Sequence, residues 1–450
     1  MAKKYDVVII GGGPAGVTTA LSARNTYPTK TICIIRKETL TPIPCGIPYV
    51  MHSLSSVTDN VLPDSLLQKN KIDLFIDEVL DFRNEKTLVL KSGEEVQFEK
   101  LVLATGSTPI VPPIQGIEKD GIFYVKKDLD YLEKLKQKVH EARRILIIGA
   151  GFIGIEFADE LNRAGKEVVI IERLPYVLSL SIDADIAEIF EKHIQSLGIQ
   201  LVTGAAVQEI YGEKKAEGVR LENGQTYPAD LILIAVGYKP NTQLAQKLGL
   251  EYHEKYGIIV DEYLRTSIRD IFAVGDCAAK RNWFTGEYTS VMLASTAMAQ
   301  GRLVGSNLFE IKVIKGFPGT LGTFSTKVGD LALGVTGLTE KQAQAMGIQY
   351  VIGFHESVDR HPGKLPGAKP VKVKLLFSRY SHFLLGAQVL GGDSVGELIN
   401  MLSVMVQNRM TDMEIDTLQI GTHPLLTASP IAYPVINATV DAILKWYTGK

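Results

Sequence analysis

The chain has few cysteines, little net charge and no long apolar run, and each shortage argues against a class of protein. Its 450 residues contain three cysteines, Cys33, Cys45 and Cys277, too few for a disulfide framework, so we expect a reducing, cytoplasmic setting. A formal net charge of −2 offers no basic field for nucleic acid or for an acidic membrane. No uninterrupted apolar stretch reaches the roughly 18 residues of a transmembrane helix.

The composition is that of an ordinary globular protein, with 46% apolar and 22% charged residues. The length predicts two to four domains. The apolar run behind Met1–Lys4 mimics a signal peptide, but a glycine turn follows it at once. We therefore expect this run to be the first strand of the fold.

Two glycine-rich motifs each follow a short apolar run directly. The first spans residues 11–16, behind Tyr5–Ile10, and the second spans residues 149–154, behind Ile145–Ile148. Each pattern predicts a buried strand, a tight turn and a helix start, where backbone N–H groups and the helix dipole can meet a pyrophosphate. One motif would be weak evidence, but two predict two dinucleotides with electron transfer between them. The cofactor-binding positions in these motifs are Gly11, Gly13, Pro14, Ala15 and Gly16 in the first, and Gly149, Gly151, Ile153 and Gly154 in the second.

The surroundings of the two motifs also repeat. Each motif is followed by a helix and a returning strand, and further along by a hairpin and a strand, over 100–104 and 230–236, that runs into a segment with glycine and proline. This long internal repeat predicts two Rossmann-like α/β units. Past about residue 320, the pattern predicts a separate α/β domain. Its expected strands span 371–377 and 383–389, and its expected helices span 397–408 and 431–446.

The residue after the second strand of each unit differs. In the second unit it is Glu172, whose carboxylate can bond ribose hydroxyls and would repel a 2′-phosphate, which favours NADH. The neighbouring Arg173 leaves NADPH open, and a solvated strand-end acid is the alternative. In the first unit the residue is Arg36, which could stack on adenine, meet phosphate or make no cofactor contact.

A third signal is Gly275-Asp276, behind a predicted strand over 271–274. The glycine permits close approach, and the carboxylate can hold a sugar-like hydroxyl.

Taken in order, residues 11–16, 104–106, 149–154, 235–237 and 275–276 resemble the pyridine nucleotide–disulfide oxidoreductases, and the likeness covers nearly the whole chain. The resemblance implies FAD in the first unit, NADH or NADPH in the second, and a C-terminal dimerisation domain of a homodimer. It implies an FAD-binding domain over 1–115 and 242–320, an NAD(P)H-binding domain over 116–241 and a dimerisation domain over 321–450.

The resemblance also implies roles for single residues. Asp276 matches the residue that holds the FAD ribitol, and Glu156 matches the position near the nicotinamide. The remaining positions assigned to cofactor binding are Val79, Ala104, Thr105, Gly106, Gly237, Gly275 and Ala294.

A single cysteine, Cys45, lies in the segment 41–49, where dithiol members of the family carry a Cys-x4-Cys pair. The segment resembles the single-cysteine branch, which contains coenzyme A-disulfide reductases, NADH oxidases, NADH peroxidases and polysulfide reductases. There the cysteine faces the flavin. Its thiolate is the required nucleophile, so its pKa must be lowered by a helix N-terminus or by the flavin. A buried structural role is the alternative for Cys45 and the expectation for Cys33 and Cys277.

The chain departs from its relatives in two ways. Pro14 stands where oxidases and peroxidases carry a histidine, and the tyrosines typical of coenzyme A-disulfide reductases are absent before Pro366 and Pro424. His423-Pro424 instead resembles the His-Pro of dithiol reductases, whose histidine crosses the dimer interface to serve the thiol. A capping or interface role is the alternative for His423. The basic residues that could hold an anionic substrate tail, or be merely solvated, are Arg24, Arg360 and Lys364.

We therefore expect an NAD(P)H-dependent flavoenzyme without a metal that reduces a disulfide, a coenzyme A-disulfide or a polysulfide-type substrate. Cys45 would be the nucleophile and His423 the proton donor. One alternative is an NADH oxidase that reduces O₂. Another is a flavoprotein reductase of an electron-carrier protein, which needs no redox cysteine.

Overall fold

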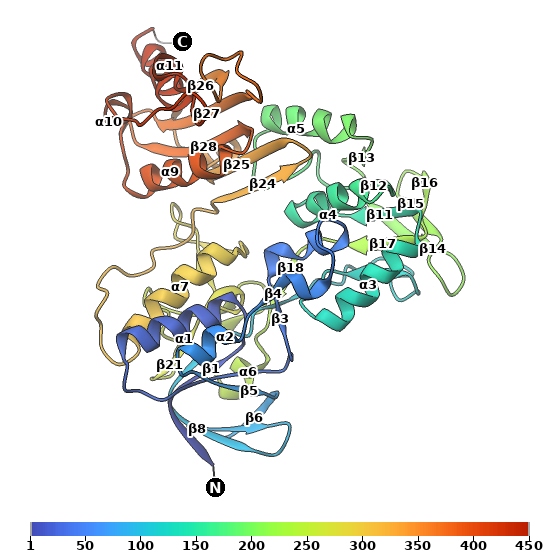
Figure 1. Ribbon diagram of the computed structural model, residues 1–450, viewed down its shortest axis with the longest axis vertical. Coiled ribbons are helices and arrows are strands. Elements are labelled where there is room, and N and C mark those ends of the chain that lie inside the picture. Colours follow the sequence, from blue (N-terminus) through green and yellow to red (C-terminus); the bar gives the residue numbers. More distant parts are fainter. Residues whose placement is uncertain (1, 449–450) are drawn as a thin grey trace. The chain divides into compact units, whose positions relative to one another are not determined.

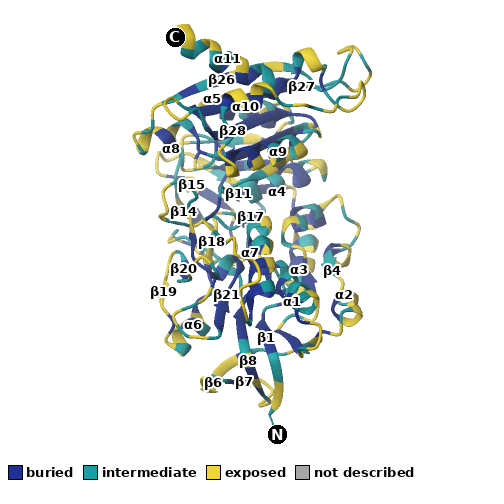
Figure 2. Cartoon of the chain, turned by 90° about the vertical axis from the view of Figure 1, so that its left-hand side faces the viewer, coloured by how far each residue is buried: buried dark blue, intermediate teal, exposed yellow. Residues whose placement is uncertain are grey.

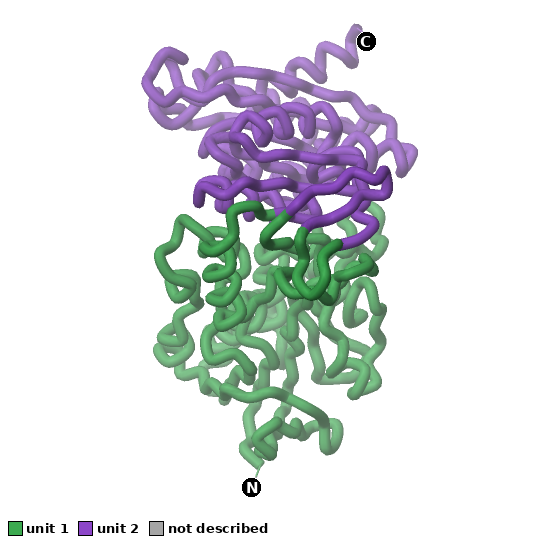
Figure 3. Tube along the Cα trace, turned by 90° about the vertical axis from the view of Figure 1, so that its right-hand side faces the viewer, with its two compact units in different colours: residues 1–145, 211–217, 229–320 green, residues 146–210, 218–228, 321–450 purple. Residues whose placement is uncertain are grey.

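The structure is a computed structural model that describes residues 2–448. The residues cluster into two compact units, which are coloured separately in Figure 3. Both units are mixed α/β, as predicted. The three-domain division expected from the sequence remains a prediction. Unit 1 comprises residues 1–145, 211–217 and 229–320, and unit 2 comprises residues 146–210, 218–228 and 321–450.

The main sheet of unit 1 has seven strands in the order β5-β2-β1-β8-β7-β6, with β21 paired to β8. Its central strands are parallel, and the buried parts of β1 and β2 are the apolar runs Val7–Ile10 and Ile32–Ile35, as expected for a sheet that is covered on both faces. Figure 2 shows the C-terminal ends of β1 and β8 in dark blue. The strands are β1 (Lys3–Ile10), β2 (Ile32–Arg36), β5 (Asp73–Ile76), β6 (Val79–Asn84), β7 (Thr87–Leu90), β8 (Glu95–Leu103) and β21 (Ile271–Ala273).

Two helices of unit 1, α1 (Pro14–Thr26) and α7 (Ala294–Asn307), lie side by side (Figure 1). Two glycines of α7 permit this contact. A Cβ on Gly301 would lie 2.8 Å from the Ala15 carbonyl oxygen, and one on Gly305 would lie 2.5 Å from the Thr19 carbonyl oxygen. The second half of α7 is thereby packed against the first half of α1, the helix that follows the first glycine turn.

Shorter elements complete unit 1. Its remaining helices are α2 (Ser65–Lys69), α3 (Leu129–Glu141), α6 (Gln243–Leu248) and the 3₁₀ turns η1 (Pro44–Gly46), η2 (Pro48–Met51), η3 (Val57–Asn60) and η4 (Gly275–Cys277). Its remaining strands are β3 (Thr41–Pro42), β4 (Val61–Leu62), β9 (Ser107–Pro109), β10 (Ile122–Tyr124), β17 (Leu231–Ile234), β18 (Tyr238–Pro240), β19 (Tyr252–His253), β20 (Gly257–Ile258), β22 (Lys280–Arg281) and β23 (Tyr288–Thr289).

The N-terminal part of unit 2 repeats the order strand, glycine turn, helix, strand, as predicted. The predicted tight turn near Glu222 is also present, because β15 and β16 pair antiparallel around it. The elements are β11 (Arg144–Ile148), α4 (Phe152–Arg163), β12 (Glu167–Ile171), α5 (Ala184–Ser196), β13 (Gln200–Val202), β14 (Val207–Tyr211), β15 (Gly218–Leu221) and β16 (Thr226–Pro228).

The C-terminal part of unit 2 is an antiparallel sheet in the order β24-β25-β28-β27-β26, covered by α9 and α11 (Figure 1). The predicted strands and helices are all present, within a few residues. Among residues 2–448, no helix is both long and apolar enough to cross a membrane. The elements are β24 (Phe324–Val328), β25 (Leu331–Gly337), α8 (Glu340–Ala345), β26 (Tyr350–Val358), β27 (Pro370–Ser378), β28 (Leu384–Gly391), α9 (Val395–Gln407), α10 (Asp412–Asp416), η5 (Pro430–Ala432) and α11 (Pro434–Thr448).

Candidate active site

The first glycine turn connects β1 to α1 and has room for a ligand at one position only. Gly11 has φ +117°, and a Cβ there would lie 2.1 Å from the Ala104 carbonyl oxygen. A Cβ on Gly16 would lie 2.0 Å from the Gly11 carbonyl oxygen. A Cβ on Gly13, in contrast, would have no atom within 4 Å, and Gly13 gives α1 no side-chain cap. The turn therefore presents an uncapped helix N-terminus to open space, which fits a pyrophosphate.

The segment around Gly275 packs against the same turn. A Cβ on Gly275 would lie 2.8 Å from the Cβ of Ala15, so only glycine allows this approach. The Gly275 N–H donates to Oε1 of the fully buried Gln300, at 2.9 Å. The fold thus brings together three predicted segments that are far apart in the sequence: the first turn, Ala104 and Gly275.

Asp276 follows Gly275 in η4, which is a three-residue 3₁₀ turn. Its Oδ2 accepts hydrogen bonds from the Ser107 hydroxyl at 2.7 Å and from Lys127 Nζ at 3.0 Å. Burial alone would raise the pKa of the Asp276 carboxyl. The charges of Lys127 and Lys280, with the Ser107 hydrogen bond, outweigh burial and hold that pKa below its ordinary value. Asp276 is therefore an anionic acceptor, which suits a polyol hydroxyl.

The two Gly-Pro segments of the internal repeat pair with each other. Strand β9, which contains Ser107, is antiparallel to β18, with Ser107 opposite Pro240. Next to this pair, Asn241 Nδ2 donates to the Thr105 carbonyl at 2.7 Å, and Thr105 Oγ1 donates to the Asn241 carbonyl at 3.1 Å. Gly106 and Gly237, with φ of +70° and +105°, form the sharp bends that precede β9 and β18.

Arg36, at the end of β2, is engaged within the protein. Its guanidinium forms a bidentate ion pair with Asp64, at 2.6 and 2.7 Å, and also donates to the carbonyls of Glu38 and Thr39. The side chain stem lies against Gly12, where a Cβ would be 2.5 Å from Arg36 Cδ. The structure gives Arg36 a role in shaping the turn, and a direct cofactor contact stays a prediction.

The second glycine turn has the same geometry. A Cβ on Gly154 would lie 2.0 Å from the Gly149 carbonyl oxygen, while a Cβ on Gly151 would have no atom within 4 Å. The Glu172 carboxylate accepts from the Ala150 N–H at 2.7 Å and from the Leu174 N–H at 2.8 Å. Each of its oxygens keeps a lone pair, so Glu172 can brace the turn and still accept ribose hydroxyls. The turn thus fits a second dinucleotide.

Glu156 lies in α4, two residues after the second motif, and is half-buried. Burial raises the pKa of its carboxyl to about 7, although a 2.8 Å hydrogen bond from the Thr326 hydroxyl favours the charged form. Thr326 lies on β24 in the same unit. A carboxyl that titrates near neutral pH is suited to a functional site.

The three cysteines differ in exposure. Cys45 is exposed in η1, whereas Cys33 and Cys277 are buried. Burial raises the pKa of the Cys33 thiol and that of the Cys277 thiol, so both are poor nucleophiles. Because η1 has only three residues, its dipole at Cys45 is small, and activation of the thiol by the flavin stays a prediction.

His423 is exposed in a loop of unit 2, and its Nδ1 accepts a hydrogen bond from the Leu425 N–H at 3.3 Å. The loop is joined to the predicted basic loop that holds Arg360 and the exposed Lys364. His361 makes this connection: its N–H donates to the Pro424 carbonyl at 3.1 Å, and its Nδ1 lies 3.0 Å from the Thr427 carbonyl oxygen. The structure therefore brings His423 and two of the candidate anion-binding residues, Arg360 and Lys364, to neighbouring loops.

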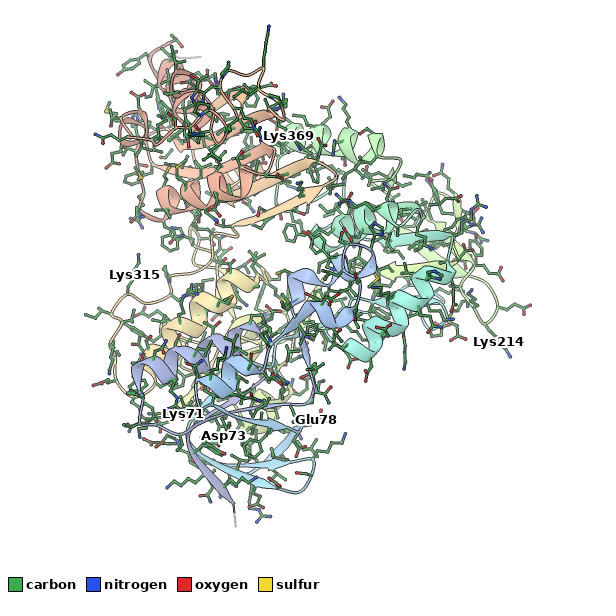
Figure 4. The ribbon with its side chains drawn as sticks, in the orientation of Figure 1. Lys71, Asp73, Glu78, Lys214, Lys315 and Lys369 are labelled. Atoms are coloured by element: carbon green, nitrogen blue, oxygen red, sulfur yellow. The ribbon has the colours of Figure 1, made fainter. Side chains whose placement is uncertain are left out.

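Three other predicted positions, Arg24, Val79 and Ala294, lie within the helices and strands of unit 1. The Arg24 guanidinium donates to the main-chain carbonyls of Pro28, Lys30, Asn70 and Lys71, so it braces the fold, and a substrate role stays a prediction. Val79 is buried in β6, and Ala294 begins α7. A cavity of about 360 Å³, lined in part by Lys71 and Asp73 (Figure 4), contains none of the predicted residues.

Sequence reasoning missed several residues that hold the site together. Gln300, Asn241 and Thr326 lie far from the residues they contact and carry no motif of their own. Nothing in the sequence points to the hydrogen bond between Ser107 and Asp276 either.

Comparison with known proteins shows the family to which this chain belongs. The model of the family described as pyridine nucleotide-disulphide oxidoreductase matches residues 5–301, and that of its dimerisation domain matches residues 323–431. The chain belongs to this family, and it is an NAD(P)H-dependent oxidoreductase that uses FAD.

Three similar proteins have names that state an activity. An NADH oxidase of Methanocaldococcus jannaschii is 33% identical over 449 residues, covering 97% of this chain and 98% of that one. An NAD(P)H coenzyme A polysulfide/persulfide reductase of Pyrococcus horikoshii is 35% identical over 407 residues, covering 87% and 88%. The solved structure of an NAD-dependent persulfide reductase from A. fulgidus has a TM-score of 0.90 and 32% identity, covering 98% of this chain and 84% of that one.

Proposed function

We propose that this enzyme uses NADH, or less efficiently NADPH, to reduce the sulfur–sulfur bond of a small-molecule disulfide, coenzyme A-disulfide or polysulfide. The observation that carries the proposal is that Cys45 is exposed, whereas the other two cysteines are buried. Cys45 also lies in the unit whose glycine turn, Gly275 and Asp276 fit FAD. Two of the relatives above are named as reductases of persulfides or polysulfides.

The two cofactors would be held by different units. In unit 1, the first turn, Thr105, Gly275 and Asp276 would hold FAD; in unit 2, the second turn, Glu172 and Glu156 would hold the nicotinamide nucleotide. FAD, when bound, supplies the chemistry that takes a hydride from NADH and passes its electron pair to a thiol centre.

Cys45 provides the nucleophile. Its thiolate attacks one substrate sulfur, the S–S bond breaks, and one thiolate leaves while a mixed disulfide forms at Cys45. The electron pair from NADH then reduces the mixed disulfide, which releases the second thiolate and restores the Cys45 thiolate. Two protons convert the two released thiolates to thiols.

His423 would supply a proton to a leaving thiolate. Because its Nδ1 accepts a hydrogen bond from the Leu425 N–H, the neutral ring carries its hydrogen on Nε2, and this N–H can donate a hydrogen bond to the leaving thiolate. By the resemblance, this histidine serves the Cys45 of the partner subunit in a homodimer located in the cytoplasm. Arg360 and Lys364, on the neighbouring loop, would bind an anionic tail of the substrate.

The second candidate function is NADH oxidation by O₂. It is favoured by the M. jannaschii relative, whose name is NADH oxidase and whose similarity spans 97% of this chain. Pro14, in place of the histidine of typical oxidases, weighs against it.

The Cys45→Ser variant tests the proposal. We expect it to lose at least about a hundredfold in reduction of coenzyme A disulfide or polysulfide, because the covalent nucleophile is gone. Reduction of the flavin by NADH should survive, and Cys33→Ala serves as the matched control. Full sulfur-reductase activity in Cys45→Ser would refute the thiol mechanism and favour the oxidase.

The partner-subunit role of His423 needs its own test. His423→Ala should lower turnover about tenfold to a thousandfold, as expected for loss of a general acid. Mixed dimers of Cys45→Ser and His423→Ala chains contain one intact pair, so they should recover activity. Heterodimers that form without recovering activity would show that the two residues do not meet across the interface.

A further inference from the structure

The turn that carries Cys45 is tied to one buried side chain, Asn60, which has a relative exposure of 3%. Asn60 ends η3, and its side-chain Nδ2 donates to the Ile43 carbonyl at 2.9 Å. Its main-chain carbonyl accepts from the Ile43 N–H at 3.0 Å. Ile43 is the N-cap of η1. Asn60 therefore forms hydrogen bonds with both the main-chain N–H and the main-chain carbonyl of the residue that precedes the cysteine turn.

The Ile43 carbonyl also links this contact to the turn itself. It accepts a second hydrogen bond, from the Gly46 N–H at 3.0 Å, and this bond closes the turn around Cys45. One carbonyl oxygen is therefore shared between the Asn60 amide and the residue next to the thiol. Displacement of the Asn60 amide would alter the acceptor that defines η1.

The Asn60 amide also accounts for the glycine that follows the cysteine. The φ of Gly46 is not in the left-handed region, so its backbone conformation does not require glycine. A Cβ on Gly46 would, however, lie 1.9 Å from Asn60 Oδ1 and 2.7 Å from Asn60 Cγ. The amide cannot move aside without breaking its bond to Ile43, so the absence of a side chain at 46 is a steric requirement.

Asn60 itself is on a well-anchored segment. Ser56 and Asp59 form a capping box at the start of η3, and β4, which begins at Val61, pairs with β3 just before the cysteine turn. From α3, Lys136 Nζ donates to the carbonyls of Leu54 and Ser55, at 3.0 and 2.8 Å. These contacts hold the segment that carries Asn60 in place, so the Asn60 amide can fix the position of η1.

We propose that Asn60 is a positioning residue for Cys45: its amide fixes the η1 turn, through Ile43 and against Gly46, in the form that presents the thiol for reaction. This inference rests on the proposed function of Cys45 as the redox thiol. Asn60 itself takes no part in the chemistry.

The first test compares Asn60→Ala with Asn70→Ala. Asn70 is a matched control because its Nδ2 also donates to a main-chain carbonyl of unit 1, that of Leu66, at 2.7 Å. In the FAD-loaded enzyme, Asn60→Ala should lower kcat for coenzyme A disulfide or polysulfide about tenfold to a hundredfold, because small misplacements of a reacting group carry such costs. It should change the rate of Cys45 alkylation by iodoacetamide at fixed neutral pH at least about threefold, a shift that a pure binding effect would not give. FAD content and flavin reduction by NADH should stay at wild-type levels, and Asn70→Ala should change none of these quantities.

The second test is a double-mutant cycle. Gly46→Ala should impair alkylation and turnover about as much as Asn60→Ala does, because the new methyl group displaces the amide. In Asn60→Ala/Gly46→Ala the obstructing atoms are gone, so the double variant should be no worse than either single variant. Additive losses, or an Asn60→Ala enzyme with wild-type alkylation and turnover, would overturn the proposal. The alkylation rates decide the matter even if Cys45→Ser retains sulfur reduction and the proposed function fails.

Discussion

The two glycine turns share one backbone geometry but differ in the side chain that stands beside them. Gly13 and Gly151 cap their helices with nearly identical φ and ψ, −75° and −177° against −76° and −178°. Beside the first turn, Arg36 is buried and paired to Asp64. Beside the second turn, Glu172 accepts hydrogen bonds from two main-chain N–H groups. Because the backbone cradles match, the choice between the two dinucleotides has to come from these side chains and from the segments packed around each turn.

The largest expected effect comes from a bulky side chain in each glycine turn, which should block one dinucleotide and leave the other bound. Gly13→Leu should abolish retention of FAD, since the new side chain would fill the open space where the pyrophosphate approaches. Gly151→Leu should leave FAD in place and weaken NADH binding at least about tenfold, or about 1.4 kcal/mol. Flavin absorbance after gel filtration and an anaerobic NADH titration measure the two outcomes. Gly13→Ala and Gly151→Ala add only a methyl group and serve as controls. A Gly13→Leu protein that stays loaded with FAD would refute the assignment of the first turn.

A smaller effect tests the side chain beside the second turn. The Glu172 carboxylate should favour NADH over NADPH by roughly 1–3 kcal/mol, about fivefold to a hundredfold in kcat/KM. Glu172→Gln removes the charge and keeps one acceptor oxygen, so it should reduce this preference. Glu188→Gln, exposed on α5 of the same unit, should leave it unchanged. A wild-type enzyme with equal kcat/KM for the two nucleotides would show that Glu172 does not discriminate.

The sequence was sufficient to predict the strands and helices on either side of each glycine turn. Apolar runs, glycines and the spacing between them predicted β1, α1, β11 and α4, because each is defined by neighbours within a few residues. Contacts over long separations could not be predicted. Lys127 lies 149 residues from its partner Asp276, and Thr326 lies 170 residues from its partner Glu156, so these pairs exist only once the chain has folded.

The smallest expected effect concerns Glu156, which has no counterpart beside the first turn, where Thr18 occupies the matching position. Burial raises the pKa of the Glu156 carboxyl from 4.5 to about 7. Below pH 4.5 it is neutral in both the folded and the unfolded chain. Between pH 4.5 and 7 the folded chain holds a proton that the unfolded chain has lost, so folding stability falls as pH rises through this window and levels off above it.

Glu156→Gln should remove that pH dependence, because the amide stays neutral and can still accept a hydrogen bond from Thr326. Relative to wild type, the variant should gain about 1–3 kcal/mol between pH 5 and pH 8, since each pKa unit is worth about 1.4 kcal/mol. Thermal unfolding of the FAD-loaded protein at the two pH values measures the difference in Tm. Glu222→Gln, in the exposed hairpin between β15 and β16, should shift Tm equally little at both. If the Tm of Glu156→Gln changed with pH just as that of the wild type does, Glu156 would already be ionised near pH 5. Its pKa would then not be raised by burial.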